Sequence, residues 1–508
     1  MSLDSALAIA NSGLTNISAQ LALVSHNVAN ASTPGYVTEI ANQQSVTAEG
    51  IGMGVATGPA TRDVGAAMQA GIYDQNAVVG GLQTTKTTLS ALDTVSGTPG
   101  QGQDVASLLG KLQDAFSTLA ADPTNQTQQS SVVAAAQTLA GGINTLANAY
   151  TAQRQTAENA IASGVTSINQ ALATIGTLSD QIIRLQAAGQ STADLENQRD
   201  AAVSGLSQQV GIKVLEQPNG DMLITTASGT TLPIHSADPL SVTAANVQPG
   251  SYYPGGGIGA IMLGGVDVTQ QMTGGSLGAN LTLRDATLPT NQAELDEFSQ
   301  NLASRFAAQG LTLFSDPSGS VPAGGGTPLQ STYVGFAAAI TVNPAVVASP
   351  SLVRDGTNAI IGSALGASAF TPNPAGGPQG FSTLITRVLN FTFGTEAQSG
   401  VAQPVSHTLG LGATGTLDAP YTAPADLSGI ASTMLASQAQ ISGTATTALG
   451  TAQAVQTSLQ SNASAAQGVN IDAQMSTMIA LQNAYGANAK VMAGVEQMWT
   501  ALMSAVTG

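Results

Sequence analysis

The sequence predicts an α+β protein of several domains: a coiled coil of the N- and C-terminal helices, a helical middle domain and an inserted β-rich domain. Three observations support this fold class. Apolar residues recur at heptad spacing at both ends, long inner stretches keep the three/four spacing of helices, and a central region alternates like strands. At 508 residues the chain is too long for one core, so about two to four domains are expected.

The N-terminal segment 3–30 predicts one helix of about 40 Å at 1.5 Å per residue. Its apolar residues alternate at spacings of four and three, as in the seam of a coiled coil. The seam residues are Leu3, Leu7, Ala10, Leu14, Ile17, Leu21, Val24 and Val28. Pro34 and Gly35 end the helix, because Pro-Gly favours a type II turn. Residues 36–70 indicate extended strands or a long connection.

Further helices are predicted through the next part of the chain. Residues 71–122 contain helical pieces that are broken near 97–100. A long helix is expected from just after Pro123 to about Ala188, because apolar residues keep the three/four spacing along it. Another helix is expected over 192–209.

The hydrophobic period then changes from that of a helix to that of strands. Short apolar runs on both sides of Asn219-Gly220 are a strong signal for a β-hairpin. The turn-rich sequence that follows includes a helix over about 290–309 and a strand near 333–342. The stretch 396–425 looks like a loop.

Two helices are predicted at the C-terminal end. Residues 427–466 carry no charge and indicate a helix of Ala, Ser, Thr and Gln. Beyond it, apolar residues recur at every seventh position, although Gln482 and Glu496 interrupt the positions between them. The residues expected to carry assembly on this helix are Ile471, Met475, Met478, Tyr485, Met492, Trp499 and Val506.

The order of helices, β insertion and helices predicts nested domains built from both ends of the chain. The predicted domains are a terminal helical assembly domain of 1–70 with 465–508, a helical domain of 71–210 with 427–464 and part of 286–310, and a mainly β-rich inserted outer domain of 211–426.

The composition narrows the classes of partner. Charged residues make up 8% of the chain, against about 25% in an ordinary soluble domain. Low charge suits surfaces that pack against copies of themselves, although a compositional habit of the source organism would produce it too. The net charge is −17 and only 12 Lys and Arg are present, so nucleic acid and anionic membrane surfaces are not expected partners.

The chain contains no cysteine, which excludes disulfides, thiolate nucleophiles and Cys-based metal sites. Chance, cytoplasmic life and export in an unfolded form all fit this absence. The N-terminus has Asp4, no basic region and no continuous apolar run, so neither a cleavable signal peptide nor a membrane span is expected. An exported chain would use a route that removes no such signal.

No catalytic, metal or cofactor site is expected. The three histidines, His26, His235 and His407, are widely separated, and none has metal-ligand spacing with a carboxylate. His26 is expected in the last turn of its helix. The polar run 194–200 is interpreted as a solvated helix face with local ion pairs rather than an active site.

The glycine pattern Gly410–Gly415 matches G-x-G-x-x-G, the motif of dinucleotide-binding sites. Pro420 and Pro424 follow it instead of a helix, so a turn is expected there. With no acid, base and pocket assembled elsewhere in the sequence, the chain is predicted not to be an enzyme.

The end of the first helix resembles the N-terminal signature of bacterial flagellar rod, hook and hook-associated axial proteins, roughly N-x-A-N-x-x-T-P-G-Y/F. The matching residues are Asn27, Ala29, Asn30, Thr33, Pro34, Gly35 and Tyr36. Residues 468–472 and 482–491 look like the C-terminal signature of this family. Val37-Thr38 and Gly486 depart from it, and Gly486 should weaken an isolated helix by up to about 1 kcal/mol.

Within that family, the chain is most similar to the hook-associated members at the junction of hook and filament. A long helical domain at 123–188 fits them, as do 194–200, similar to L-x-x-Q-R-D, and 274–285, similar to G-G-x-L-G-A followed by R-D. The resemblance covers roughly 1–345 and 427–508.

The resemblance implies a structural subunit of the extracellular flagellum that self-assembles through its terminal helices. Its implied partners are copies of itself in a helical ring of about eleven subunits, the hook protein, a second junction protein and the filament. Type III export with a secretion chaperone is also implied. The chaperone would bind the C-terminal helix through Met475, Met478, Tyr485, Met492 and Trp499.

The terminal helices are expected to be mobile in the free monomer, because isolated amphipathic helices are marginally stable. Two alternatives remain open. One is a flagellar hook or distal-rod protein, and the other is a secreted adhesin or surface-layer structural protein.

Overall fold

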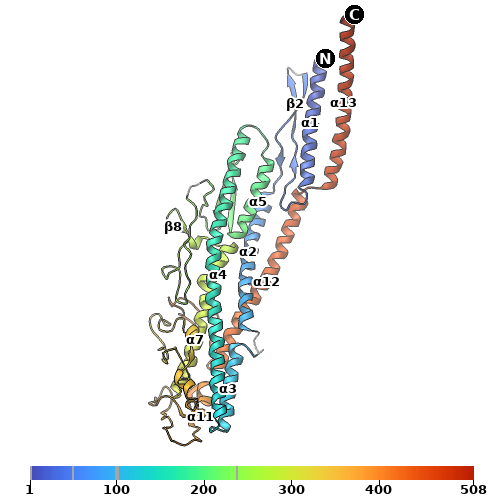
Figure 1. Cartoon of the computed structure of the whole chain (residues 1–508). Coiled ribbons are helices and arrows are strands. Elements are labelled where there is room, and N and C mark those ends of the chain that lie inside the picture. The colour runs from blue at the N-terminus through green and yellow to red at the C-terminus, as the bar shows by residue number, and fades with distance from the viewer. Residues whose placement is uncertain (1–2, 49–50, 98–101, 236–237, 508) are drawn as a thin grey trace.

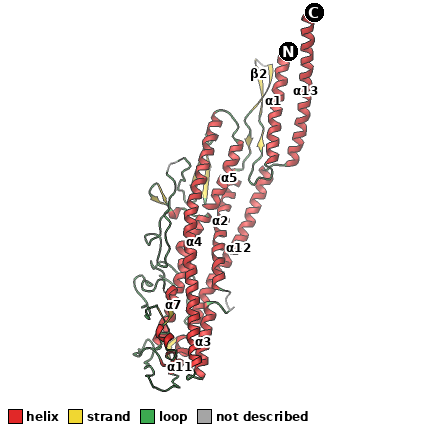
Figure 2. Ribbon diagram, viewed as in Figure 1, coloured by secondary structure: helices red, strands yellow, loops and turns green. Residues whose placement is uncertain are grey.

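The computed structural model describes residues 3–48, 51–97, 102–235 and 238–507. The molecule is elongated and mainly helical, and its two termini lie at the same end (Figure 1). Long helices run along its length, while loops and short strands cover one side of the half farthest from the termini (Figure 2). This arrangement of terminal helices, helical middle and small sheets confirms the predicted fold class.

The terminal unit contains helix α1 (Leu3–Ala29), helix α13 (Ile471–Thr507) and the antiparallel hairpin of β2 (Gln43–Ala48) and β3 (Ile51–Thr57). Helix α1 packs against both α13 and β3. This confirms the expected N-terminal helix. Residues 36–70 were expected to form either extended strands or a long connection, and the hairpin shows that part of this stretch forms extended strands.

The expected turn after α1 is also present. The amide of Tyr36 donates to the carbonyl of Thr33 at 3.2 Å, and Gly35 between them has a φ of 78°. A positive φ at the third residue of a four-residue turn is the type II geometry that favours glycine. The chain then returns through β1 (Glu39–Ile40), which pairs antiparallel with β4 (Thr61–Arg62).

Five helices form the body next to the terminal unit. They are α2 (Ala66–Ser96), α3 (Val105–Ala121), α4 (Gln126–Ala187), α5 (Ala193–Gln209) and α12 (Leu427–Gln467). All five match predicted helices. The break predicted near 97–100 follows Ser96, the last residue of α2, and residues 98–100 lie outside the described residues. Helix α4 has 62 residues, about 93 Å at 1.5 Å per residue.

Helix α4 stays continuous through Gly141 and Gly142 because its apolar face is buried on both sides of them, from Leu139 to Ile143. Its N-terminus is capped by Asn125, whose side chain accepts from the amides of Thr127 and Gln128. Tertiary packing therefore outweighs the helix-weakening effect of two adjacent glycines.

The inserted region begins with the predicted hairpin. Strand β5 (Ile212–Glu216) pairs with β6 (Met222–Thr226), and Gly220 in the loop between them has a φ of 85°. The chain continues through β7 (Met262–Leu263), β8 (Val266–Asp267) and the 3₁₀ turn η1 (Thr269–Gln271). Helix α6 (Gly275–Thr282), the π-helical turn η2 (Leu283–Thr287) and helix α7 (Leu288–Ala308) then pack on the helical body, as expected for 290–309.

The rest of the inserted region has short elements joined by long loops. They are β9 (Phe314–Ser315), α8 (Phe336–Ala339), β10 (Thr341–Val342), α9 (Pro344–Ala348), α10 (Leu352–Asp355), α11 (Thr383–Arg387), the π-helical turn η3 (Val388–Thr392), β11 (Glu396–Gln398) and β12 (Val401–Ala402). Every sheet among the described residues has two strands. The domain boundaries given above stay predictions.

The strand expected near 333–342 is present only at its end, as β10, because the rest of that stretch is mainly turn and helix α8. Its buried residues Tyr333, Phe336, Ala337 and Ile340 follow the three/four spacing of a helix rather than alternating. Two of the amides there, those of Gly335 and Ala337, donate to the buried carboxylate of Asp296 on α7.

Two large hydrophobic clusters hold the body together, beside a small third one of Ala293, Leu411 and Ala419. One surrounds the phenylalanines Phe116, Phe306 and Phe393, whose ring centroids lie 5.6–6.4 Å apart, where α3, α4 and α7 meet. The other lies where α4, α5, α6 and the β5–β6 hairpin meet. Neither cluster includes a residue of α1 or α13, so the terminal unit is packed separately from the body.

Candidate assembly interface

The predicted seam of α1 matches one covered face of that helix. Ala10, Ile17 and Val24 are 4–7% exposed, and Leu14, Leu21 and Val28 are half-buried. Leu7 is 37% exposed, and the side chain of Leu3 lies outside the described set. The helix packs against α13 near Gly13, where an added Cβ would lie 3.4 Å from the side chain of Asn488.

The inner face of α13 has a different register from the predicted one. Its covered positions run at three/four spacing through Met478, Leu481, Asn488, Met492 and Val495. The covered residues after Met478 and Met492 are Leu481 and Val495, three positions further along the helix. The sequence analysis instead expected the residues four positions further along, Gln482 and Glu496, in the seam. Because of this shift, Gln482 and Glu496 are exposed and do not interrupt the seam.

Helix α13 carries large apolar side chains that its neighbours leave exposed. Among the described residues of this helix, Val495 alone is buried. The large apolar side chains that are 43–57% exposed are Ile471, Met475, Ile479, Tyr485, Val491, Met498, Trp499, Leu502 and Met503. Of the predicted assembly residues, Ile471, Met475, Tyr485 and Trp499 belong to this exposed set, Met478 and Met492 are half-buried, and the side chain of Val506 lies outside the described set. Apolar faces of this size mark interaction surfaces.

The family motif forms the joint between the terminal unit and the body. Asn27 is buried, its Nδ2 donates to the carbonyl of Glu39 at 2.9 Å, and its Oδ1 accepts from the amide of Glu39 at 3.0 Å. The hydroxyl of Tyr36 also donates to Oδ1, at 3.0 Å. An amide side chain supplies both a donor and an acceptor, so Asn27 holds the returning chain as a paired strand would.

Other motif residues close the end of α1. The side chain of Asn30 donates to the carbonyl of His26 at 3.1 Å, and the Thr33 hydroxyl donates to Asn30 Oδ1 at 3.4 Å. Ala29 is the last residue of the helix, and Pro34 and Gly35 occupy the central positions of the turn. The motif residues therefore share one structural task, which is to turn the chain from α1 onto the body.

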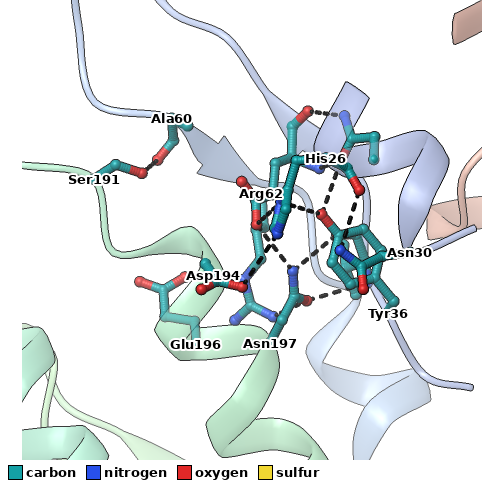
Figure 3. Close-up of polar contacts among 12 residues, drawn as sticks. His26, Asn30, Tyr36, Ala60, Arg62, Ser191, Asp194, Glu196 and Asn197 are labelled. Atoms are coloured by element: carbon teal, nitrogen blue, oxygen red, sulfur yellow. Dashed lines mark hydrogen bonds and ion pairs between the residues drawn. The ribbon is translucent and has the colours of Figure 1, made fainter. Parts of the chain in front are cut away.

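Helix α5 provides the other side of this joint (Figure 3). Arg62 reaches three side chains of α5: it pairs with Glu196 at 3.0 Å and Asp200 at 2.8 Å, and donates to Asn197 at 2.9 Å. Asn197 also accepts from the amide of Val37 at 3.1 Å and donates to its carbonyl at 3.2 Å. These contacts tie the turn after α1 directly to α5.

The interpretation of 194–200 as a solvated face holds for Asp194 and Gln198 but is wrong for the residues that meet the body. Asn197, Arg199 and Asp200 are 2–8% exposed, because the β1–β4 region and the β5–β6 hairpin cover them. Arg199 donates to the carbonyl of Gly220 at 2.7 Å and pairs with Glu216 at 2.9 Å. Burial raises the pKa of Asp200, and Arg62 opposes that rise.

The structure also brings His26, Glu39 and Asp194 together. His26 Nδ1 lies 3.6 Å from Glu39 Oε1, and Nε2 lies 3.7 Å from Asp194 Oδ1. One ligand atom from each residue lies within 4.8 Å of the others, which is close enough for a shared cation. Sequence spacing missed this group because its members come from α1, β1 and α5. Burial raises the pKa of the Glu39 carboxyl, while His26 lowers it.

The remaining histidines have carboxylate neighbours as well. His235 lies 2.9 Å from Asp221 and 3.5 Å from Asp180, and His407 lies 3.2 Å from Glu297. The expected turn at Gly410–Gly415 is confirmed, since Leu411 and Leu417 bridge across it. The backbone of that loop binds side chains of the body, as in the bond from Gly412 to Gln330.

Among the described residues, one helix is long and apolar enough to cross a membrane, Asp4–Ala29, with a mean hydropathy of 1.2 in its most apolar window. Core helices and signal sequences meet the same criterion. In this structure the apolar residues of that helix pack against α13 and the β2–β3 hairpin.

Three family models match the chain in order. The flagellar basal body rod protein model matches 7–36, the flagellar hook-associated protein FlgK helical domain matches 89–319, and the flagellar basal body rod FlgEFG protein C-terminal model matches 460–505. The first and last matches cover the joint and the terminal helices described above. The middle match covers α3 to α7.

Individual proteins give the same result. Flagellar hook-associated protein 1 of Salmonella typhimurium is 29% identical over 322 residues, and that of Escherichia coli K12 is 27% identical over 316 residues. These matches cover 59% of this chain and 55–56% of the relatives, so the chain spans about half the length of the curated relatives it matches.

A solved structure, that of the flagellar hook junction protein FlgK from Burkholderia pseudomallei, matches with a TM-score of 0.41 and 26% sequence identity. The match covers 50% of this chain and 45% of that chain.

Proposed function

Because the chain belongs to the flagellar hook-associated protein family, we propose that it is a structural subunit at the junction between hook and filament. The observation that carries this proposal is the exposed apolar surface of α13, in the segment that matches a flagellar axial family. Covering such apolar surface with other subunits lowers the free energy and favours assembly.

Subunits assemble by covering the exposed apolar residues of α13 and those of the β2–β3 hairpin, Val46 and Met53. Contacts between different faces of identical subunits build helical arrays, and the family implies a ring of about eleven copies. The hook protein borders this ring on one side. A second junction protein and the filament lie on the other.

Before assembly, the same apolar surface of α13 is covered by a secretion chaperone. Met475, Tyr485 and Trp499 are between 43% and 46% exposed on one long amphipathic helix, which suits the insertion of a helix into an apolar groove. Met478 and Met492 are half-buried against α1, so the chaperone reaches them only when α13 leaves α1. The chain travels through the type III export apparatus to the outside of the cell, and its role there is structural, without catalysis, cofactor or membrane insertion.

Deletion of residues 1–30 in the source bacterium tests this proposal, with flagella examined by electron microscopy. We expect complete hooks that carry no filaments, and restoration of filaments by the full chain. Loss of the hooks themselves would favour the alternative of a hook or distal-rod protein. Normal filaments and motility would contradict a flagellar role and favour a secreted adhesin or surface-layer protein.

A further inference from the structure

The joint between α1 and the body contains two carboxylates that are incompletely balanced by positive charge. Arg62 forms ion pairs with Glu196 and Asp200. Among the described residues, Glu39 and Asp194 each have His26 as their ionic partner within 4.0 Å. Two negative charges therefore face one imidazole, which carries at most one positive charge.

The hydrogen bonds around His26 assign its two ring nitrogens. The Tyr36 hydroxyl donates its proton to Asn27 Oδ1, so its oxygen is free to accept from Nδ1–H of His26, 3.3 Å away. With the proton on Nδ1, the neutral ring has a lone pair on Nε2. That lone pair faces Asp194 Oδ1 at 3.7 Å, which is beyond hydrogen-bond distance.

The gap between these atoms has the size that a bound metal ion requires. Two ligand atoms that are each about 2.1 Å from one zinc ion lie about 3.4 Å apart at the tetrahedral angle. One ring nitrogen of His26 and one oxygen from each carboxylate lie within 4.8 Å of one another. The Asp194 side chain is 53% exposed, and its other oxygen accepts from Gln198 Nε2 at 3.0 Å. Glu39 is 4% exposed and fixed by Asn27 and Asn197.

We propose that His26 Nε2, Glu39 and Asp194 bind one divalent transition-metal ion of the zinc class, with water completing the coordination. Imidazole with carboxylates is a ligand set for such ions, and a histidine ligand usually donates its other N–H to a neighbouring oxygen, as His26 does to Tyr36. The ion joins α1, β1 and α5, so it stiffens the connection between terminal unit and body. The inference does not depend on the proposed function.

Zinc chloride titrated into the full chain, followed by calorimetry, tests the site. We expect one ion per chain, and a dissociation constant at least tenfold weaker in His26→Gln and in Asp194→Asn. His235→Gln is the matched control, because His235 also lies between two carboxylates but contacts Asp221 at hydrogen-bond distance. It should bind zinc as the original chain does.

Hydrogen exchange provides a second measurement. Zinc should slow exchange in residues 24–40 and 193–200 of the original chain and leave Asp194→Asn unchanged. Asp194 is half exposed, so this variant should keep the circular dichroism spectrum of the original chain. The proposal is overturned if His26→Gln and Asp194→Asn bind zinc as tightly as the original chain, or if no zinc binds at about millimolar concentration.

Discussion

The buried side chain of Asn27 pairs with both backbone groups of Glu39, at 2.9 Å through its Nδ2 and at 3.0 Å through its Oδ1. This contact holds the chain that returns from the first helix. The bond from the amide of Thr38 to the carbonyl of Gln467, 2.9 Å long, ties the same chain to the end of α12. The end of α1 and the end of α12 are thereby held at one joint.

Asn27→Asp should weaken this joint. The substitution keeps the side-chain shape, removes the donor to the Glu39 carbonyl and adds a buried charge. Losing one buried hydrogen bond in this way costs about 1–3 kcal/mol. We expect faster hydrogen exchange at residues 37–40. Asn11→Asp, on an exposed position of the same helix, is the control, and equal exchange in the two variants would contradict this role of Asn27.

The register of α13 can be tested with two neighbouring residues. Leu481 lies on the inner face, whereas Gln482 is exposed. Leu481→Ser should loosen the pairing of α13 with α1 by about 1–2 kcal/mol, since it removes a half-buried leucine. Gln482→Ser should have little effect. Limited proteolysis of the C-terminal segment measures the difference, and greater sensitivity in the Gln482 variant would support the register predicted from sequence.

Trp499→Ala should weaken assembly and chaperone binding. The side chain is 46% exposed in the free chain, and buried tryptophans at protein interfaces commonly contribute about 2 kcal/mol or more. We expect at least a tenfold loss of affinity, measured by sedimentation of assembled protein and by titration with the chaperone. Tyr485→Ala should act in the same direction.

Leu365→Ala is the control for these two variants, because Leu365 is 89% exposed and lies in the inserted region. Neither α13 variant should change the thermal unfolding of the body, since no residue of α13 belongs to its hydrophobic clusters. If Trp499→Ala destabilised the body as much as it weakened assembly, α13 would be part of the core.

The stability of the body should decrease as the pH rises from about 4.5 to about 8. Burial raises the pKa of Glu294 from 4.5 to about 7 and that of Asp296 from 3.8 to about 7. A carboxyl whose pKa is higher in the folded state binds its proton more tightly there. Its contribution to stability is complete below the unfolded pKa and is lost as the pH passes through the folded value.

Glu294→Gln should reduce this pH dependence. Gln438 donates to Glu294 Oε2 at 3.1 Å, and Oε1 has no hydrogen-bond partner among the described residues, as a protonated carboxyl would tolerate. Between pH 5 and pH 8, the free energy of unfolding of this variant should fall by about 3 kcal/mol less than that of the original chain, because the variant has no carboxyl to ionise at this position. Asp296 still titrates, so part of the slope should remain. Urea unfolding at several pH values measures it, and an unchanged slope would contradict the assignment.

The sequence predicts the helices well because their signal is local. The seam of α1, the long helix α4 and the turn at Pro34-Gly35 each depend on residues a few positions apart. The strand expected near 333–342 is limited to Thr341–Val342, and the sequence did not show this because helical and alternating spacing both fit so short an apolar stretch. Packing of α8 against α4 and α7 decides its conformation.

The joint is not predictable from spacing, because its contacts cross long stretches of chain. Arg62 and Asp200 are 138 residues apart, and Asn197 binds Val37 across 160. A run such as 194–200 looks like a solvated helix face until its partner is known. The signal available beforehand was the resemblance of this run, and of the motif before it, to flagellar axial proteins.

Hydrogen exchange at residues 3–35 and 471–507, compared between the free chain and the assembled polymer, tests the central claim most directly. The terminal helices should exchange rapidly in the free chain, because α13 buries little of its apolar surface there, and slowly once neighbouring subunits cover them. Slow exchange of both segments in the free chain, unchanged by assembly, would contradict the claim that these helices are completed by the polymer.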